Sequence, residues 1–263
     1  MSRFFQVKAF INHWLDSVEE HSLHSPFFFD FYDKVVKGGD SNNDFSDLEK
    51  VRTNLLSNTS VIKVDDFGSG SVVKSMQGRE RRIADIAATS LTPAFLAQMY
   101  YRICEYTEVH TVVELGTSMG LTSLYLSGLP DVKVHTFEGS HALANIALTN
   151  FEYFEKKNIN LIEGDIATTL PRFLQDNLAK IGFALIDANH RYAPTIQYFD
   201  WLMKRFNEKS IMVIDDIHHS PEMEKAWNEL KKHYLVYGSV DLFRCGILFF
   251  EPGLNRQHFV WAF

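Results

Sequence analysis

The apolar and polar residues divide the chain into two regions with different periodicity. Before about residue 100, apolar side chains recur at helical spacing, and the dipeptide Ser25-Pro26 supplies the N-cap and first-turn residues that begin a helix. The dipeptide Thr92-Pro93 indicates that one helix ends and another begins there. Helices are therefore expected at residues 4–18, from 26 onward, at 47–56 and within 83–106, with a polar loop at 38–47.

From residue 110 onward, short apolar runs alternate with helical segments. Such alternation is typical of right-handed β-α-β units and a parallel sheet. Near the C-terminus, two strand-like runs follow each other too closely for a helical crossover, so they are expected to form an antiparallel hairpin. The expected strands are 111–115, 133–137, 159–162, 182–187, 210–214, 234–243 and 245–250, and the expected helices are 120–128, 140–157, 170–179, 194–206 and 221–233.

The segment Val112-Val113-Glu114-Leu115-Gly116-Thr117-Ser118-Met119-Gly120-Leu121-Thr122 joins the first of these strands to a helix. Glycine tolerates a positive φ and lets a ligand approach the backbone closely. The following helix N-terminus offers unpaired N–H groups to an anionic group. The glycine spacing is GxxxG, which differs from the GxGxxG fingerprint of dinucleotide-binding proteins.

Polar residues follow all five of the predicted parallel strands. In an open α/β sheet the carboxyl ends of the strands surround the ligand site. Burying such groups without partners costs a few kcal/mol each, roughly, so packing alone does not explain them. The groups are Glu114 with Gly116, Glu138, Glu163 with Asp165, Asp187 with His190, and Asp215-Asp216 with His218-His219.

Composition narrows the classes of protein that the chain can represent. The net charge of −7 argues against a nucleic-acid partner, although Arg79, Arg81 and Arg82 form a local basic group. Because apolar runs stay short of the roughly 18 residues that cross a bilayer and the N-terminus lacks a signal-peptide core, we expect no membrane association. The two cysteines lie in apolar patterns, which favours a reducing cytoplasm and buried thiols.

The ordered set of motifs resembles the class I S-adenosylmethionine-dependent methyltransferases. The likeness is greatest to the O-methyltransferases that include the catechol and caffeoyl-coenzyme A enzymes and related bacterial enzymes, and it covers roughly residues 94–250. It implies an α/β fold with a Rossmann-like, seven-stranded, mostly parallel sheet of order 3-2-1-4-5-7-6, the last strand antiparallel and helices on both faces. Residues 1–93 would form a helical extension that caps the acceptor, and residues 94–263 the S-adenosylmethionine-binding domain.

The resemblance also implies contacts with the methyl donor. Glu114 would face the methionine ammonium, directly or through water, and Thr122 would hold the carboxylate. Glu138, with the adjoining Gly139, would accept the ribose hydroxyls. The remaining expected cofactor residues are Gly116, Thr117 and Gly120 around the amino acid part, Asp165 and Ile166 around the adenine, and Asp187.

For the transfer step, the resemblance implies a divalent metal held by Asp187, Asp215 and Asp216, and three carboxylates suit Mg²⁺. Two departures stand out. The third ligand is often asparagine in the family, and the lysine that follows the first aspartate by three positions is His190 here. Either a metal activates the acceptor hydroxyl, or His190, then His218, serves as general base. Asp187 is also expected to be a catalytic residue. One of the paired aspartates could instead only cap the following turn.

Alternative interpretations remain open at the level of sequence. An NAD-dependent oxidoreductase fits the acid after the second strand but not the GxxxG spacing, and a non-catalytic cofactor-binding module retains the same fold. The segment 64–71 also resembles a glycine motif, but no strand with a terminal acid follows it. The expected partner is a small-molecule acceptor. The aromatic run 27–32 and residues 259–263 cover the core or form a homodimer contact.

Overall fold

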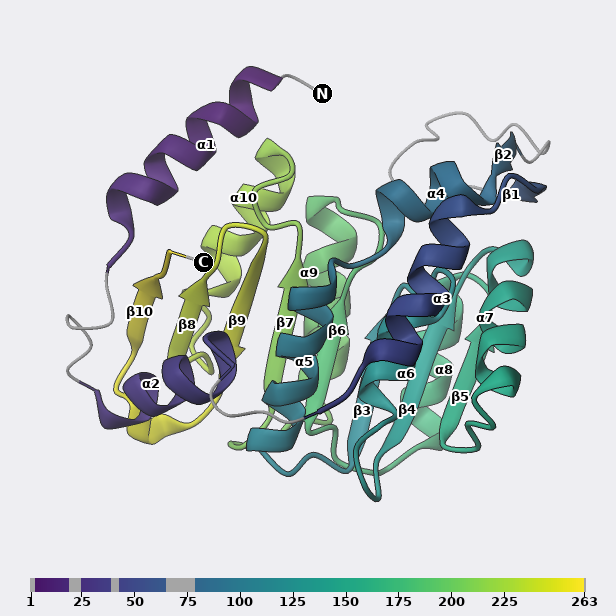
Figure 1. The fold of residues 1–263 in the computed structure, drawn as a ribbon. Helices are drawn as coiled ribbons and strands as arrows, with labels where there is room; N and C mark the ends of the chain where they lie inside the picture. Colours follow the sequence, from purple (N-terminus) through teal and green to yellow (C-terminus); the bar gives the residue numbers. More distant parts are fainter. Residues whose placement is uncertain (1–2, 19–24, 39–42, 65–78, 263) are drawn as a thin grey trace. The chain divides into compact units, whose positions relative to one another are not determined.

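The computed structural model describes residues 3–18, 25–38, 43–64 and 79–262. It is an α/β protein whose mainly parallel central sheet has eight strands, with helices around it (Figure 1). The chain forms two compact units. Unit 1 comprises Met1–Gly39 and Leu178–Phe263, and unit 2 comprises Asp40–Asn177.

Unit 2 contains three parallel strands in the order β3-β4-β5. The central apolar residues of β3 are buried on both faces, which explains why its sequence is a continuous apolar run and not an alternating one. The predicted strands and the helices between them are confirmed, with boundaries shifted by a few residues. The elements are β3 (Thr111–Leu115), α6 (Leu121–Leu126), β4 (Lys133–Glu138), α7 (His141–Tyr153), β5 (Ile159–Glu163) and α8 (Ile166–Asp176).

The first part of unit 2 is helical, as expected, and the predicted break near Thr92-Pro93 is present. It separates α4 (Ile83–Ser90) from α5 (Ala94–Tyr106), since proline cannot supply the N–H that a continuous helix requires. A third helix is α3 (Ser46–Ser57). The antiparallel pair β1 (Val61–Val64) and β2 (Arg79–Arg82) was not predicted. Of the glycine motif at 64–71, all but Val64 lies outside the described residues.

Unit 1 holds the other five strands of the sheet. The predicted parallel pair β6 (Phe183–Ile186) and β7 (Ile211–Asp215) is present, and β9 (Cys245–Phe249) runs antiparallel to both β7 and β8 (Gly238–Asp241). The predicted count of seven strands is wrong. After β9 the chain reverses through Asn255 and Arg256, both at positive φ, and β10 (Gln257–Val260) pairs parallel with β8. The predicted order is therefore wrong at this edge, where β10 lies beyond β8.

The aromatic run at the start of unit 1 packs into its interior. Phe28 and Phe31 are fully buried, with ring centroids 5.3 Å and 5.0 Å from that of Phe249. Trp261 is also fully buried, so the C-terminal residues of the sheet share this core. The helices of unit 1 are α1 (Arg3–Asp16), α2 (Pro26–Phe31), the π-helix Tyr32–Val36, α9 (Tyr192–Met203), α10 (Pro221–Leu230) and the 3₁₀ turn Pro252–Leu254.

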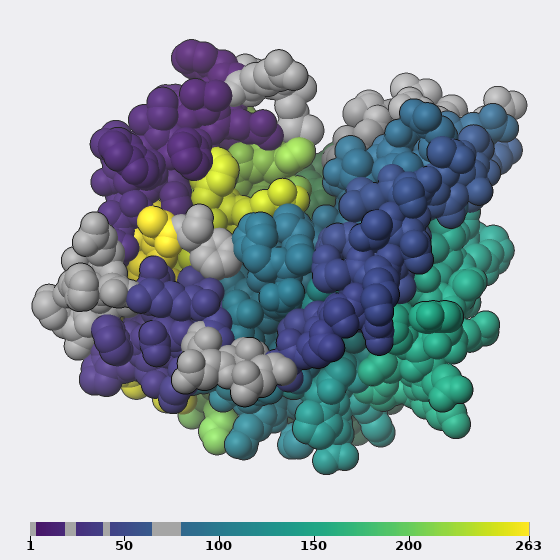
Figure 2. Space-filling view, in the orientation of Figure 1, coloured from purple at the N-terminus to yellow at the C-terminus, as the bar shows by residue number. Residues whose placement is uncertain are grey.

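Helix α1 differs from the other helices of unit 1 in how little of its apolar face is covered. Phe4, Trp14 and Leu15 are 79%, 66% and 67% exposed, whereas Ala9 and His13 are buried. Figure 2 shows this helix, in purple, at the molecular surface. Within the described residues, no helix is both long enough and apolar enough to cross a membrane.

Candidate functional site

The loop after β3 is held against the neighbouring strand β4. The N–H groups of Gly116 and Thr117 both donate to the carbonyl of Phe137 at 3.0 Å. Gly116 and Gly120 have φ values of 104° and 82°, in the region that favours glycine. A Cβ on Gly120 would also lie 2.6 Å from the Phe151 ring. The glycine spacing therefore reflects both backbone conformation and close packing of the loop on α7.

Glu114, at the end of β3, is a buried carboxylate with one unsatisfied oxygen. Its Oε2 accepts hydrogen bonds from Ser123 and, at 2.6 Å, from Thr136. Its Oε1 is buried and has no hydrogen-bond partner in the described part of the chain. Burial raises the pKa of Glu114 to about 7, against the opposing effect of the Ser123 and Thr136 hydroxyls. Such an oxygen can accept a hydrogen bond from a cationic ligand, which would also favour the ionised carboxylate.

Glu138, at the end of β4, joins two loops through its carboxylate. Its Oε2 accepts the N–H of Ser118 at 2.8 Å, and its Oε1 accepts the N–H of Ser140 at 2.8 Å. Burial raises the pKa of Glu138, and the N–H groups of Ser140, Ser118 and Gly139 oppose that rise. Because each carboxylate oxygen has two acceptor positions, Glu138 can still accept hydroxyl groups of a ligand.

Other predicted cofactor residues of unit 2 have local structural partners. Thr117 and Thr136 share a hydrogen bond of 2.6 Å between their hydroxyls. Thr122, in the first turn of α6, donates to the hydroxyl of Thr92 at 3.1 Å. Asp165 caps α8 by accepting the N–H of Ala167 at 2.9 Å. Thr117 and Thr122 follow β3, and Asp165 and the buried Ile166 follow β5. Unit 2 therefore contains every predicted cofactor residue except Asp187.

Unit 1 carries the predicted chemical groups. After β6, Asn189 and His190 have φ values of 64° and 38°, a strained reversal that returns the imidazole toward Asp187. His190 Nε2 lies 3.6 Å from Asp187 Oδ1, and its Nδ1 lies 3.9 Å from Asp216 Oδ2. His219 Nδ1 lies 3.7 Å from the same Asp216 oxygen. The structure thus places His190 between two carboxylates.

The aspartate pair at the end of β7 consists of the buried Asp215 and the partly exposed Asp216. Asp215 is buried, and burial raises its pKa well above the usual value, as do the charges of Asp187 and Asp216. Arg244 and His190 oppose this rise, and Arg244 Nε lies 3.7 Å from Asp216. Within the described residues, no group of three or more His, Cys, Asp or Glu side chains is arranged to hold a metal ion. The Mg²⁺ site at Asp187, Asp215 and Asp216 stays a prediction.

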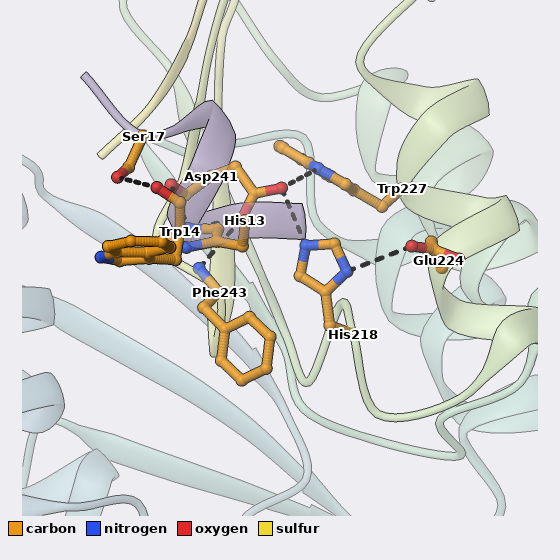
Figure 3. Close-up of polar contacts among 8 residues, drawn as sticks. All are labelled: His13, Trp14, Ser17, His218, Glu224, Trp227, Asp241 and Phe243. Atoms are coloured by element: carbon orange, nitrogen blue, oxygen red, sulfur yellow. Dashed lines mark hydrogen bonds and ion pairs between the residues drawn. The ribbon is translucent and has the colours of Figure 1, made fainter. Parts of the chain in front are cut away.

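His218 belongs to a different network, shown in Figure 3. Its Nε2 lies 2.9 Å from Asp241 Oδ2, and its ring stacks on Phe243. The same Asp241 carboxylate accepts Trp227 Nε1–H at 2.9 Å and lies 3.4 Å from His13 Nε2. Burial raises the pKa of Asp241, but hydrogen bonds from both histidines outweigh it and hold that pKa below the usual range. His190 and His218 thus have separate sets of acidic partners.

Sequence reasoning did not identify Asp241 and His13 as a pair, because 228 residues separate them in the chain. The available signal was a single acid in an otherwise apolar strand, since a buried carboxylate requires a partner. The same limitation applies to Arg52, which donates to the Thr92 carbonyl at 2.7 Å. Neither arginine spacing nor helix periodicity indicates that contact.

The geometry agrees with the comparisons with known proteins. Residues 113–217 match a family model described as a methyltransferase domain. This range extends from the middle of β3 to the loop after β7, and includes Glu114, Glu138, His190 and Asp216. No curated protein matches the chain.

Solved structures, two of them O-methyltransferases, share the fold at low sequence identity. The chain is similar to the O-methyltransferase TomG from Streptomyces achromogenes, solved in complex with SAM, at 16% identity, TM-score 0.54, and coverage of 62% of this chain and 82% of that one. An O-methyltransferase from Bacillus cereus in complex with SAH gives 16% identity, TM-score 0.53, and coverage of 61% and 82%. Cofactor-bound Rv0187 from MTB gives 12% identity, TM-score 0.58, and coverage of 87% and 98%.

The family match locates the domain, and the structural likeness establishes its fold. The predicted resemblance to methyltransferases is confirmed, whereas the oxidoreductase alternative is not favoured. Residues 113–217 are the part of the chain that matches the methyltransferase-domain model.

Proposed function

We propose that this methyltransferase transfers a methyl group from S-adenosylmethionine to a hydroxyl oxygen of a small molecule. The buried, unpaired Oε1 of Glu114 is the observation that carries this proposal. It lies at the end of β3, where an ammonium would supply the missing hydrogen bond and the opposite charge. Two structural neighbours were solved with SAM or SAH, the same donor and its product.

The residues of unit 2 fit the separate parts of the donor. Glu114 would bind the methionine ammonium and Thr122 the carboxylate, while Gly116, Thr117 and Gly120 would surround the amino acid part. Glu138 and Gly139 would bind the ribose, and Asp165 and Ile166 would flank the adenine. In unit 1, Asp187 would be the remaining contact. When bound, the donor supplies an electrophilic methyl group on a sulfonium.

His190 is the residue we propose as general base. A hydroxyl must lose its proton as its oxygen bonds to the methyl carbon, and a neutral imidazole accepts protons near neutral pH. Asp187, at 3.6 Å, would stabilise the imidazolium that forms. This assignment needs no metal. A Mg²⁺ ion held by Asp187, Asp215 and Asp216 would be the alternative means of lowering the pKa of the acceptor hydroxyl.

Calorimetric titration with S-adenosylhomocysteine tests the proposed donor. We expect one binding site per chain, and a parallel titration with NADH to give no heat. Absence of binding by both S-adenosylmethionine and S-adenosylhomocysteine would overturn the proposal. Transfer of labelled methyl groups to phenols, sugar hydroxyls and carboxylates would then identify the acceptor class. The proposal expects transfer to a phenol or sugar hydroxyl and none to a carboxylate.

The organisation of the chain around this activity is also a proposal. Residues 94–263 would bind the donor, and residues 1–93 would select the acceptor. A cytoplasmic location and a homodimer complete the proposal. Multi-angle light scattering on the purified chain checks the dimer, and a monomeric mass at micromolar concentration would exclude it.

A further inference from the structure

The candidate cofactor loop is connected to α3 through a chain of polar contacts. Arg52, on α3, donates from Nη1 to the carbonyl of Thr92 at 2.7 Å. Thr92 is buried between α4 and α5, and its hydroxyl accepts the hydroxyl of Thr122 at 3.1 Å. Thr122 lies in the first turn of α6, directly after the glycine loop. Three residues far apart in sequence therefore form one connected path.

The position of Arg52 is set by an acid on its own helix. Its Nε lies 2.9 Å from Glu49 Oε2, and Glu49 also accepts the hydroxyl of Tyr125, on α6. The Arg52 side chain is only 13% exposed. Its Nη2 is buried with no hydrogen-bond partner in the described part of the chain. Glu49 balances the charge of the buried guanidinium, and the unpaired nitrogen makes its burial costly.

The two threonine hydroxyls can reverse their hydrogen bond. A hydroxyl is both donor and acceptor, and its hydrogen rotates to suit its neighbours. If a carboxylate binds at Thr122, the Thr122 hydroxyl can turn toward it while the Thr92 hydroxyl donates to Thr122. Arg52, bound to the Thr92 carbonyl, would hold that peptide in place and contribute positive charge behind the pair. Hydrogen bonds in such a series strengthen one another.

We infer that Arg52 is a positioning residue for the carboxylate end of the methyl donor, acting through Thr92 and Thr122. The inference rests on the proposed function, because it presumes that an amino acid group binds beside the glycine loop. It assigns a role to α3, outside the matched methyltransferase domain at residues 113–217. It further predicts that Arg52 affects recognition of the amino acid part of the donor and not recognition of its nucleoside.

Binding of two ligands to one variant tests this role. S-adenosylhomocysteine carries the amino acid part, whereas 5′-methylthioadenosine has the same nucleoside and sulfur without it. For Arg52→Met, we expect the Kd of S-adenosylhomocysteine to rise about tenfold, the usual size for a hydrogen bond to a charged group, and that of 5′-methylthioadenosine to change less than about twofold. An equal rise for both ligands, or no change for either, would overturn the inference.

Arg82→Met is the matched control. Arg82 is also paired with an acid three residues away, Asp85, but 58% of its side chain is exposed. The control removes the same charge and should leave both Kd values unchanged.

If Arg52→Met does not fold, judged by circular dichroism, Thr92→Val replaces it, because valine keeps the shape and removes the hydroxyl. Selective loss of S-adenosylhomocysteine affinity then supports the path, and an unselective loss overturns it. A wild-type chain that binds neither ligand contradicts the proposed function itself.

Discussion

Thr136 on β4 donates a hydrogen bond of 2.6 Å to the carboxylate of Glu114 on the neighbouring strand β3. With the Ser123 hydroxyl on the same oxygen, this bond leaves the other oxygen of Glu114 buried and unpaired among the described residues. A carboxylate arranged in this way is costly in the free protein and useful once a cationic group binds. Glu114 is therefore the residue where stability and ligand binding should conflict most directly.

Replacing Glu114 with glutamine should weaken the binding of S-adenosylhomocysteine. The amide keeps the shape and can accept the Ser123 and Thr136 hydroxyls, but it lacks the charge that attracts an ammonium. We expect the Kd to rise by about 10- to 100-fold, the range for a hydrogen bond to a charged group. Isothermal titration calorimetry measures this change. Unaltered affinity would contradict the proposed contact with the ammonium.

The same carboxylate should make the stability of the free protein depend on pH. The pKa of Glu114 is raised from 4.5 to about 7, so the folded state binds its proton more tightly than the unfolded state. The stabilisation that the folded protein gains from this tighter proton binding is fully present below about pH 4.5 and is lost as the pH rises through 7. Relative to Glu114→Gln, the wild-type free energy of unfolding should fall by about 3 kcal/mol between pH 5 and 8. Urea denaturation at several pH values measures both proteins, and parallel curves would refute the prediction.

Replacing His190 with alanine should remove the proposed general base. We expect kcat to fall by about 10²- to 10⁴-fold, the usual contribution of such a group, with the Kd of S-adenosylhomocysteine nearly unchanged. EDTA should leave the wild-type rate unaltered. Methyl transfer measured with labelled donor tests both points. Loss of activity in EDTA and its recovery with Mg²⁺ would instead support the metal predicted from sequence.

His218→Ala provides the comparison for that experiment. His218 lies 2.9 Å from Asp241 and has a set of acidic partners separate from that of His190. We expect this substitution to lower the free energy of unfolding and to lower kcat much less than His190→Ala does. A fall in kcat as large as that of His190→Ala, in a protein of unchanged stability, would restore His218 as the catalytic histidine.

Asp241→Asn should destabilise unit 1. It removes the charge that pairs with His13 and His218, and breaking a buried pair costs about 3–5 kcal/mol. Because the pKa of Asp241 is lowered in the folded state, the ionised carboxylate stabilises the fold above its usual pKa of 3.8. This stabilisation is lost as the pH falls below 3.8 toward the lowered pKa of the folded state. Chemical denaturation at pH 7 measures the loss. Glu224→Gln is the control, since Glu224 is more exposed and lies 3.6 Å from His218, and should cost less than about 1 kcal/mol.

Much of the architecture could be predicted because its signals are local. The apolar run of β3, the glycines after it and Pro93 before α5 act on their own backbone, and each prediction agrees with the structure. The short strand β10 was missed since its four residues, Gln257 to Val260, carry little periodic signal. It forms because the left-handed residues Asn255 and Arg256 return the chain alongside β8.

The sequence by itself determined the order of the elements and the acids that end the strands, because hydrophobic periodicity and turn chemistry depend on near neighbours. Only the tertiary structure decided how each of those acids is used. Burial and partners from distant elements left Glu114 with one unpaired oxygen among the described residues and raised the pKa of Asp215. They also paired His218 with Asp241, which is not a partner of His190. Partners such as Arg52 and Thr92 are 40 residues apart in the chain, so their contact follows from helix packing and has no local signal.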